Sequence, residues 1–95
     1  MAEIEDTLIE RGKRYGKFTG HAQVSQEIQI AMADGLERNG KDWNSMQHDQ
    51  VEALFMIAHK IGRIINGDPD YADSWVDIAG YAKLVSDRLE GQIER

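Results

Sequence analysis

Three carboxylates are the side chains of this sequence whose types and spacing could hold a metal ion. Asp73 and Asp77 stand four positions apart in the segment DSWVDIAGYA, so on a helix they lie on one side, one turn apart. Glu52, on an earlier segment, could supply a third carboxylate. Because carboxylate oxygens are ligands of Mg²⁺, we predict Glu52, Asp73 and Asp77 as its ligands. The alternative is a solvated face, with Asp73 stabilised by a helix N-terminus.

The basic segment ERGKRYGKFTGH, residues 10–21, is a candidate anion site. Arginine matches phosphate geometry with its planar fork, the free N–H groups of a following helix favour anions, and the aromatic rings could stack on a base. Alternatively, the charges form salt bridges such as Glu10 with Arg14, and the rings close the end of a bundle. The predicted ligand-binding residues here are Arg11, Arg14, Tyr15, Lys17, Phe18 and His21.

A second polar stripe follows helical spacing from His48 through Glu52 and His59 to Arg63. Its functional interpretation is a mixed site, with Glu52 on a metal and nearby cations on phosphate oxygens. The alternative is an exposed face of mixed charge. Tyr81 lies near the side that carries Asp73 and Asp77 and could meet a ligand or a second chain. The further predicted ligand-binding residues are His59, Lys60, Arg63 and Tyr81.

Composition and missing motifs exclude several classes of function. The chain has no cysteine, which excludes disulfides, thiolate metal sites and a cysteine nucleophile. It has no P-loop, no dinucleotide-binding glycine motif and no serine nucleophile elbow. A net charge of −6 argues against broad nucleic-acid binding, which needs a basic face. The acidic N-terminus is unlike a signal peptide, and no run of 18 apolar residues occurs, so we expect a cytoplasmic protein without membrane contact.

The elements that must position these residues are helices, because the hydrophobic periodicity is helical throughout. We predict an all-α fold, a compact four-helix bundle formed by residues 1–95 as a single domain. The first three helices should cover about residues 3–15, 22–38 and 44–66, and the fourth should run from residues 70–73 to about residue 90. Asn44 is the predicted N-cap of the third helix. The predicted core face of the fourth helix is Trp75, Ile78, Ala79, Ala82, Val85, Leu89 and Ile93.

Two features predict self-association. About half the circumference of the third helix is apolar, and the fourth carries a second, partly apolar face. Gly80 and its small neighbours Ala79 and Ala82 would allow another helix or a flat ligand to approach closely. A chain of 95 residues also buries only a modest fraction of its surface alone. We therefore expect a homo-oligomer.

Three segments carry a family resemblance: ER…YGKF, MIAHKIGRIINGDP and DSWVDIAGYAKL. Together they resemble a group of small helical proteins encoded by phages and prophages, which is similar to the MazG-type nucleotide pyrophosphohydrolases. The resemblance implies a MazG-like fold and Mg²⁺ held by helix-borne carboxylates, with Glu52 and Asp77 as catalytic residues. Two positions depart from the MazG pattern, because Met56 and Ser74 stand where acids are expected.

Three functions therefore remain open. The first is binding of nucleotides or nucleotide-derived ligands by a phage-type protein, with Mg²⁺-dependent pyrophosphohydrolysis if the acids suffice. The second is a non-catalytic anti-defence sponge that sequesters cyclic or other nucleotide immune signals in the host cytoplasm. The third is a protein-interaction module that inhibits a host factor through its acidic surface.

Overall fold

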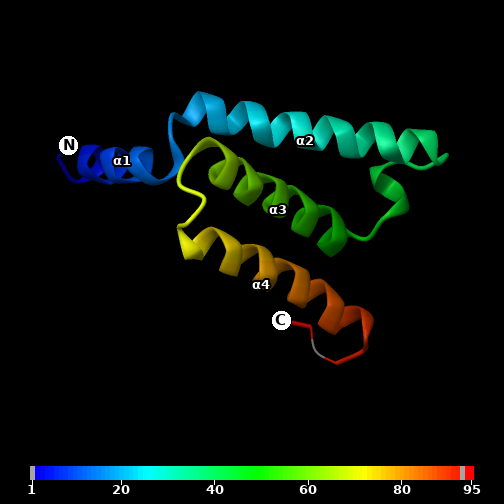
Figure 1. The fold of residues 1–95 in the computed structure, drawn as a ribbon. Helices are drawn as coiled ribbons and strands as arrows, with labels where there is room; N and C mark the ends of the chain where they lie inside the picture. Colours follow the sequence, from blue (N-terminus) through cyan, green and yellow to red (C-terminus); the bar gives the residue numbers. More distant parts are fainter. Residues whose placement is uncertain (1, 93) are drawn as a thin grey trace.

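The computed structural model describes residues 2–92 and 94–95. These residues form four α-helices and one short 3₁₀-helix and contain no strand, so the all-α prediction is confirmed. In that part of the chain, no helix has the length and apolar character needed to cross a membrane. The elements, in chain order, are α1 (Ala2–Tyr15), α2 (Phe18–Arg38), the 3₁₀-helix Trp43–Ser45, α3 (His48–Asn66) and α4 (Ala72–Leu89) (Figure 1).

The junction between α1 and α2 is shorter than predicted. Gly16 ends α1 with a φ of 76°, a conformation that glycine adopts without strain. Only Gly16 and Lys17 separate the two helices, so Phe18 and His21 lie in the first turn of α2 and not in a linker. Asn66 at the end of α3 fixes this corner, because its side-chain amide donates to the carbonyl oxygens of Tyr15 (2.8 Å) and Lys17 (2.9 Å).

The start of α3 also differs from the prediction that Asn44 caps it. Asp42 instead accepts a hydrogen bond from the backbone of Asn44 and caps the 3₁₀-helix. The chain then turns, and α3 begins at His48 with Gln47 as its N-cap. Gln47 and Gln50 form the capping box, so the reciprocal side-chain pairing is present but one turn later than expected.

The arrangement of the helices is a layer with α3 in the middle. α3 packs against α2 on one side and α4 on the other, while α2 and α4 make at most marginal contact with each other. α1 extends away from this layer beyond the end of α3 (Figure 1). A layer leaves two broad faces of α3 uncovered.

The two faces differ in composition, as helical geometry at 100° per residue requires. The polar face carries the α3 residues His48, Glu52, His59 and Arg63. The apolar face carries Leu54, Ile61 and Ile65 of α3 and Trp75, Ala79, Ala82 and Leu89 of α4.

The predicted core face of α4 is only partly buried. Ile78 and Val85 are half-buried against α3, but Trp75 is 55% exposed and Leu89 58% exposed, while Ile93 lies outside the described residues. Ser74 is the fully buried residue at the start of α4. The reason is that α4 packs mainly against one helix, α3. The residues that face α3 are covered, and the apolar residues beside them are not.

Candidate functional site

Two arginines and two tyrosines from three elements meet at the corner where α1, α3 and α4 converge. We call Arg14, Tyr15, Arg63 and Tyr71 the Arg–Tyr cluster. The guanidinium carbon of Arg14 lies 4.5 Å from the ring centroid of Tyr71, and Arg14 also donates to the Tyr71 hydroxyl. The rings of Tyr15 and Tyr71 meet edge to face at 6.1 Å. The guanidinium carbon of Arg63 lies 4.2 Å from the ring centroid of Tyr15.

The local backbone explains why these side chains converge. Gly67 ends α3 so close to the end of α1 that a Cβ there would lie 2.2 Å from the Arg14 carbonyl oxygen. The Asp68 amide then donates to that same oxygen at 2.6 Å. Glycine is therefore required at position 67 for close approach, and this approach brings Tyr71, four residues later, against Arg14.

Arg63 differs from the other cations of this corner. Arg14 forms the predicted ion pair with Glu10 (2.8 Å) and Lys60 pairs with Asp77 (3.0 Å). Among the described residues, Arg63 has no carboxylate within ion-pair distance. Its Nε atom is buried and has no hydrogen-bond partner. A buried donor without a partner is unfavourable by about 1–3 kcal/mol, and stacking on the Tyr15 ring holds the guanidinium beside it.

Asp73 and Asp77, the two predicted metal ligands on α4, are each engaged by a neighbouring side chain. Asp73 accepts a hydrogen bond of 2.8 Å from the Tyr71 hydroxyl, and this bond raises the pKa of Tyr71 above its ordinary value. Asp77 forms an ion pair with the Lys60 ammonium, and the Lys60 side chain is only 11% exposed. Both aspartates are thus partnered within the chain instead of facing solvent alone.

The rings of His21 and His59 contact each other between α2 and α3, tilted by 59°. Their ring centroids are 4.3 Å apart, and His21 Nε2 lies 2.9 Å from the His59 carbonyl oxygen. Burial lowers the pKa of His59 to about 4, with further lowering by the charges of His21, Arg63 and Lys60. Burial likewise lowers the pKa of His21, which is 3% exposed and fits against Gly62. Both rings are therefore neutral at pH 7 and cannot act as cations toward phosphate.

The three acids predicted to hold Mg²⁺ do not meet. The described residues contain no group of three or more histidine, cysteine, aspartate or glutamate side chains that could hold a metal ion. Glu52 lies two turns before Lys60, the α3 residue that contacts Asp77, which is roughly 12 Å along the helix axis. The donor set of this chain therefore does not fit a Mg²⁺ centre built from Glu52, Asp73 and Asp77.

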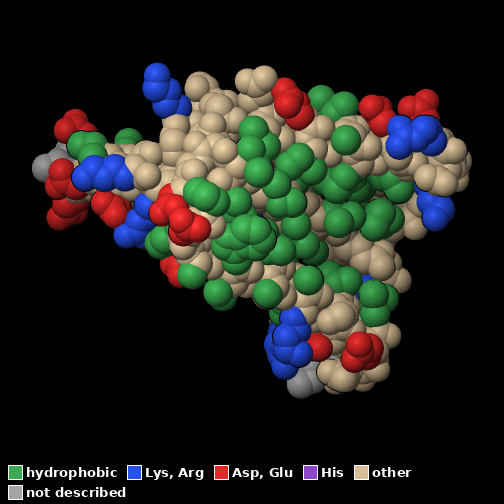
Figure 2. Space-filling model, viewed as in Figure 1, with side chains coloured by type: hydrophobic (Ala, Val, Ile, Leu, Met, Phe, Trp, Pro, Cys, Tyr) green, Lys and Arg blue, Asp and Glu red, His purple; other side chains and the backbone are tan. Residues whose placement is uncertain are grey.

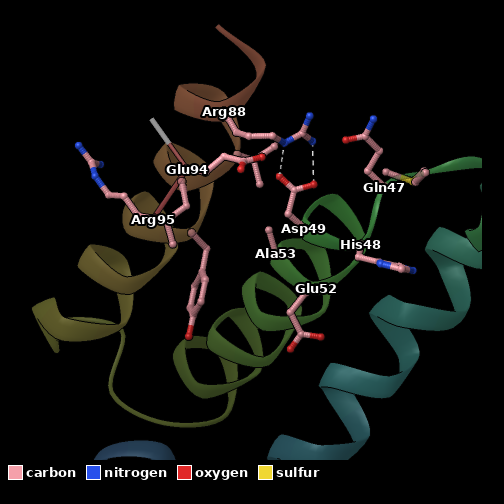
Figure 3. A pocket seen from close by; sticks show the side chains of 12 residues that line it. Gln47, His48, Asp49, Glu52, Ala53, Arg88, Glu94 and Arg95 are labelled. Atoms are coloured by element: carbon pink, nitrogen blue, oxygen red, sulfur yellow. Dashed lines mark hydrogen bonds and ion pairs between the residues drawn. The ribbon is translucent and has the colours of Figure 1, made fainter. Parts of the chain in front are cut away.

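Glu52 lines a different feature, a groove of about 740 Å³ between α3 and α4. Figure 3 shows Glu52 and His48 projecting from α3, while Asp49 faces Arg88. Arg88 binds Asp49 with two hydrogen bonds of 2.7 Å, which lower the pKa of Asp49. Tyr81 lines the same groove, so it lies near Glu52 and apart from the Arg–Tyr cluster.

The remaining predicted residues are at the surface around the corner. Arg11 and Lys17 are exposed, and Phe18 is 75% exposed with its ring edge-to-face with His21 at 5.9 Å. Sequence reasoning missed Tyr71 and Asn66, which fix the corner. The feature of the sequence that could have identified them is their position, because both flank the sharp GDPD turn that joins α3 to α4.

These features define a small all-α protein with a cationic and aromatic corner on one side of a helix layer. By comparison with family models, the chain belongs to the family described as domain of unknown function DUF6378, whose model matches residues 2–89. Searches of curated proteins and of solved structures found no match.

Proposed function

We propose that this protein binds a phosphate-bearing nucleotide or nucleotide-derived ligand at the Arg–Tyr cluster without hydrolysing it. The observation that carries the proposal is Arg63, whose guanidinium is stacked on Tyr15 and whose buried Nε lacks an acceptor. Stacking on an aromatic face fixes the plane of a guanidinium, and a fixed fork binds phosphate oxygens with two parallel hydrogen bonds.

Neighbouring groups support phosphate as the ligand chemistry. Lys60 lies one turn before Arg63 on α3, so a second cation is within reach of the same anion. The Lys60 ammonium pairs with Asp77, and a phosphate group could bind the same ammonium. A carboxylate ligand would satisfy one fork, whereas a phosphate or diphosphate offers enough oxygens for both cations.

The aromatic side chains support a nucleotide over inorganic phosphate. The ring of Phe18 is 75% exposed at the first turn of α2 and contacts His21. The His21 ring centroid lies 4.3 Å from that of His59, and His59 precedes Arg63 by one turn on α3, so Arg63 follows this aromatic contact along one face of the helix. An exposed ring next to a phosphate-binding guanidinium is a stacking surface for a base.

The separation of the predicted acids favours binding over hydrolysis in this proposal. Pyrophosphohydrolysis of the MazG type needs carboxylates gathered around Mg²⁺, and Glu52 lies roughly two helical turns from the pair of Lys60 and Asp77. We therefore favour sequestration of an intact ligand, with a nucleotide-derived immune signal as one candidate class.

Calorimetry with a ligand panel tests this proposal. The panel comprises nucleoside mono- and triphosphates, cyclic dinucleotides, ADP-ribose and inorganic phosphate, each with and without Mg²⁺. We expect one nucleotide class to bind without Mg²⁺ and to be recovered chemically unchanged. Pyrophosphate release in the presence of Mg²⁺ would instead support an enzyme, and no binding from the whole panel would overturn the proposal.

Variants of Arg63 connect any binding to the proposed site. Arg63→Ala should weaken binding by about 10- to 100-fold, because a hydrogen bond to a charged group contributes about 1.5–3 kcal/mol. Arg63→Lys keeps the charge but loses the fork, and it should also weaken binding. The matched control is Arg38→Ala, an exposed arginine in the last turn of α2. Equal loss in Arg38→Ala would show a general effect of charge.

A further inference from the structure

The apolar face of the helix layer is a continuous hydrophobic surface. Figure 2 shows hydrophobic side chains gathered over α2, α3 and the start of α4, with Lys, Arg, Asp and Glu around the edges. Ile65 is 69% exposed and Trp75 55% exposed on this face. Single exposed apolar residues are ordinary, but a contiguous patch rimmed by polar residues marks an interaction site.

The grooves confirm that these residues share one side. The α3 residues that line grooves are His48, Asp49, Glu52, Ala53, Phe55 and His59, which lie toward the polar face. In α4, the groove-lining residues include Tyr81, Leu84 and Arg88. Trp75, Ala79 and Ala82 line none of the described grooves, because they lie on the opposite flank of the same helix.

The chain alone has more surface than a folded monomer of its size. Its accessible surface is 6895 Å², whereas a 10.8 kDa monomer is expected to expose about 5,500 Å². Part of the excess of roughly 1,400 Å² belongs to α1, which extends away from the layer, and the whole is larger than the roughly 800 Å² that each partner contributes to a standard interface. The radius of gyration of 15.5 Å also exceeds the roughly 12 Å expected for 95 residues.

The core inside the layer is correspondingly thin. Ala53, Ala58 and Ile64 are the buried apolar residues of the described chain, and no large side chain there is fully buried. A protein whose central helix is covered on only two sides needs a further surface to complete its core. The excess area and the thin core are what a chain that buries this face against a second copy would show.

We infer that a second copy of this chain covers the apolar face, so that the protein is a homodimer with two layers packed face to face. A two-fold axis near α3 would bring Ile61 and Ile65 against the same residues of the partner, as isologous interfaces require. Ala79 and Ala82 on α4 allow close approach of a partner helix. The face lacks charged side chains at its centre (Figure 2), so the net charge of −6 per chain stays outside the interface.

The first test is the mass of the unmodified protein in solution. Light scattering coupled to size exclusion at micromolar concentration should give twice the 10.8 kDa of one chain. A mass of 10.8 kDa across this concentration range would overturn the proposal, whatever other molecule the apolar face then binds.

The second test identifies the face without disrupting the fold. The chain has no cysteine, so single cysteines report on their own positions. Ile65→Cys on the apolar face should react with a maleimide roughly tenfold or more slowly than Gln26→Cys, because the dimer must open first. Gln26 is the matched control, since it is exposed and lines the groove of the polar face. Equal rates in a protein of dimeric mass would place the interface elsewhere and overturn the assignment.

Discussion

The polar face of the helix layer carries the histidines, the Glu52 groove and Arg63, whereas the apolar face carries aliphatic side chains and Trp75. Both faces belong to the same central helix, and neither is covered by another element of the chain. On the polar face, charged groups find partners across elements, as Arg88 does with Asp49 and Lys60 with Asp77. On the apolar face, Ile65 and Trp75 remain largely exposed.

This difference shows how one thin layer can provide two functions. Polar side chains can be satisfied by ion pairs and hydrogen bonds within a single chain, so the polar face can stay open to a small ligand. Apolar side chains are stabilised only by removal from water, so the apolar face requires another surface. We therefore propose ligand binding for the first face and association for the second.

The largest expected effect comes from a charge on the apolar face. Ala82→Glu replaces one good helix former with another, but in the proposed dimer it places an unpaired carboxylate in the interface. We expect dissociation to the 10.8 kDa monomer, with the interface weakened by about 3 kcal/mol or more. Light scattering measures the change.

The matched change on the polar face is Gln26→Glu, which adds the same charge at an exposed position of α2. It should leave the mass unchanged. If both variants remain dimeric, the two faces do not differ as we argue, and the apolar face is not the interface.

The second effect concerns the ion pair on the polar side of α4. Lys60 is 11% exposed and Asp77 46% exposed in their side chains, so removing Asp77 leaves a nearly buried charge without its partner. We expect Asp77→Asn to lower the free energy of unfolding by about 1–3 kcal/mol. Lys60→Met should have a smaller effect, because Asp77 can be hydrated. Urea denaturation of both variants compares them, and equal losses would contradict the asymmetry.

The helices were predictable from sequence, but their neighbours were not. Hydrophobic periodicity predicted four helices, and the predicted ends of the first three at residues 15, 38 and 66 are confirmed. The periodicity of α4 gave an apolar stripe too wide for one neighbour. Sequence could not show which part of that stripe the chain covers, because burial depends on whether α2 reaches α4, and the two helices make at most marginal contact.

Sequence predicted which residues belong to the candidate site better than it predicted which of them lie together. Arg14, Tyr15 and Arg63 were predicted ligand-binding residues and meet at one corner, whereas Lys60 pairs with Asp77. Glu52 was grouped with Asp77 because both are acids on facing helices. Their separation is a matter of register, which the pairs of Asp49 with Arg88 and Lys60 with Asp77 fix. Single-sequence spacing specifies the face of a helix but not its register against a neighbour.

The third effect is a pH dependence located on the polar face. Burial lowers the pKa of His59 to about 4 in the folded chain, below its ordinary value near 6.5. The unfolded chain therefore binds a proton at higher pH than the folded chain, and stability present above pH 6.5 is lost as the pH falls toward 4. We expect a loss of roughly 1 kcal/mol, discounted for the partial exposure of His59.

Urea denaturation between pH 4 and 7.5 measures this loss, and His59→Gln should reduce it. The mass of the proposed dimer should not change between pH 6.5 and 7.5, since the α3 and α4 residues named on the apolar face carry no titrating group. A mass that followed the titration of His59 would link the two faces and contradict their independence.

The smallest effect comes from Gly80, the glycine inside α4. A Cβ at this position would meet no atom within 4 Å, and Gly80 lines a groove with Asp77 and Tyr81 instead of the apolar face. Gly80→Ala should therefore stabilise the protein by about 0.5–1 kcal/mol, because alanine favours a helix interior. Thermal denaturation measures this gain. Destabilisation would instead mean that a partner chain contacts this side of α4 closely, and both faces of the layer would then have to be counted as interfaces.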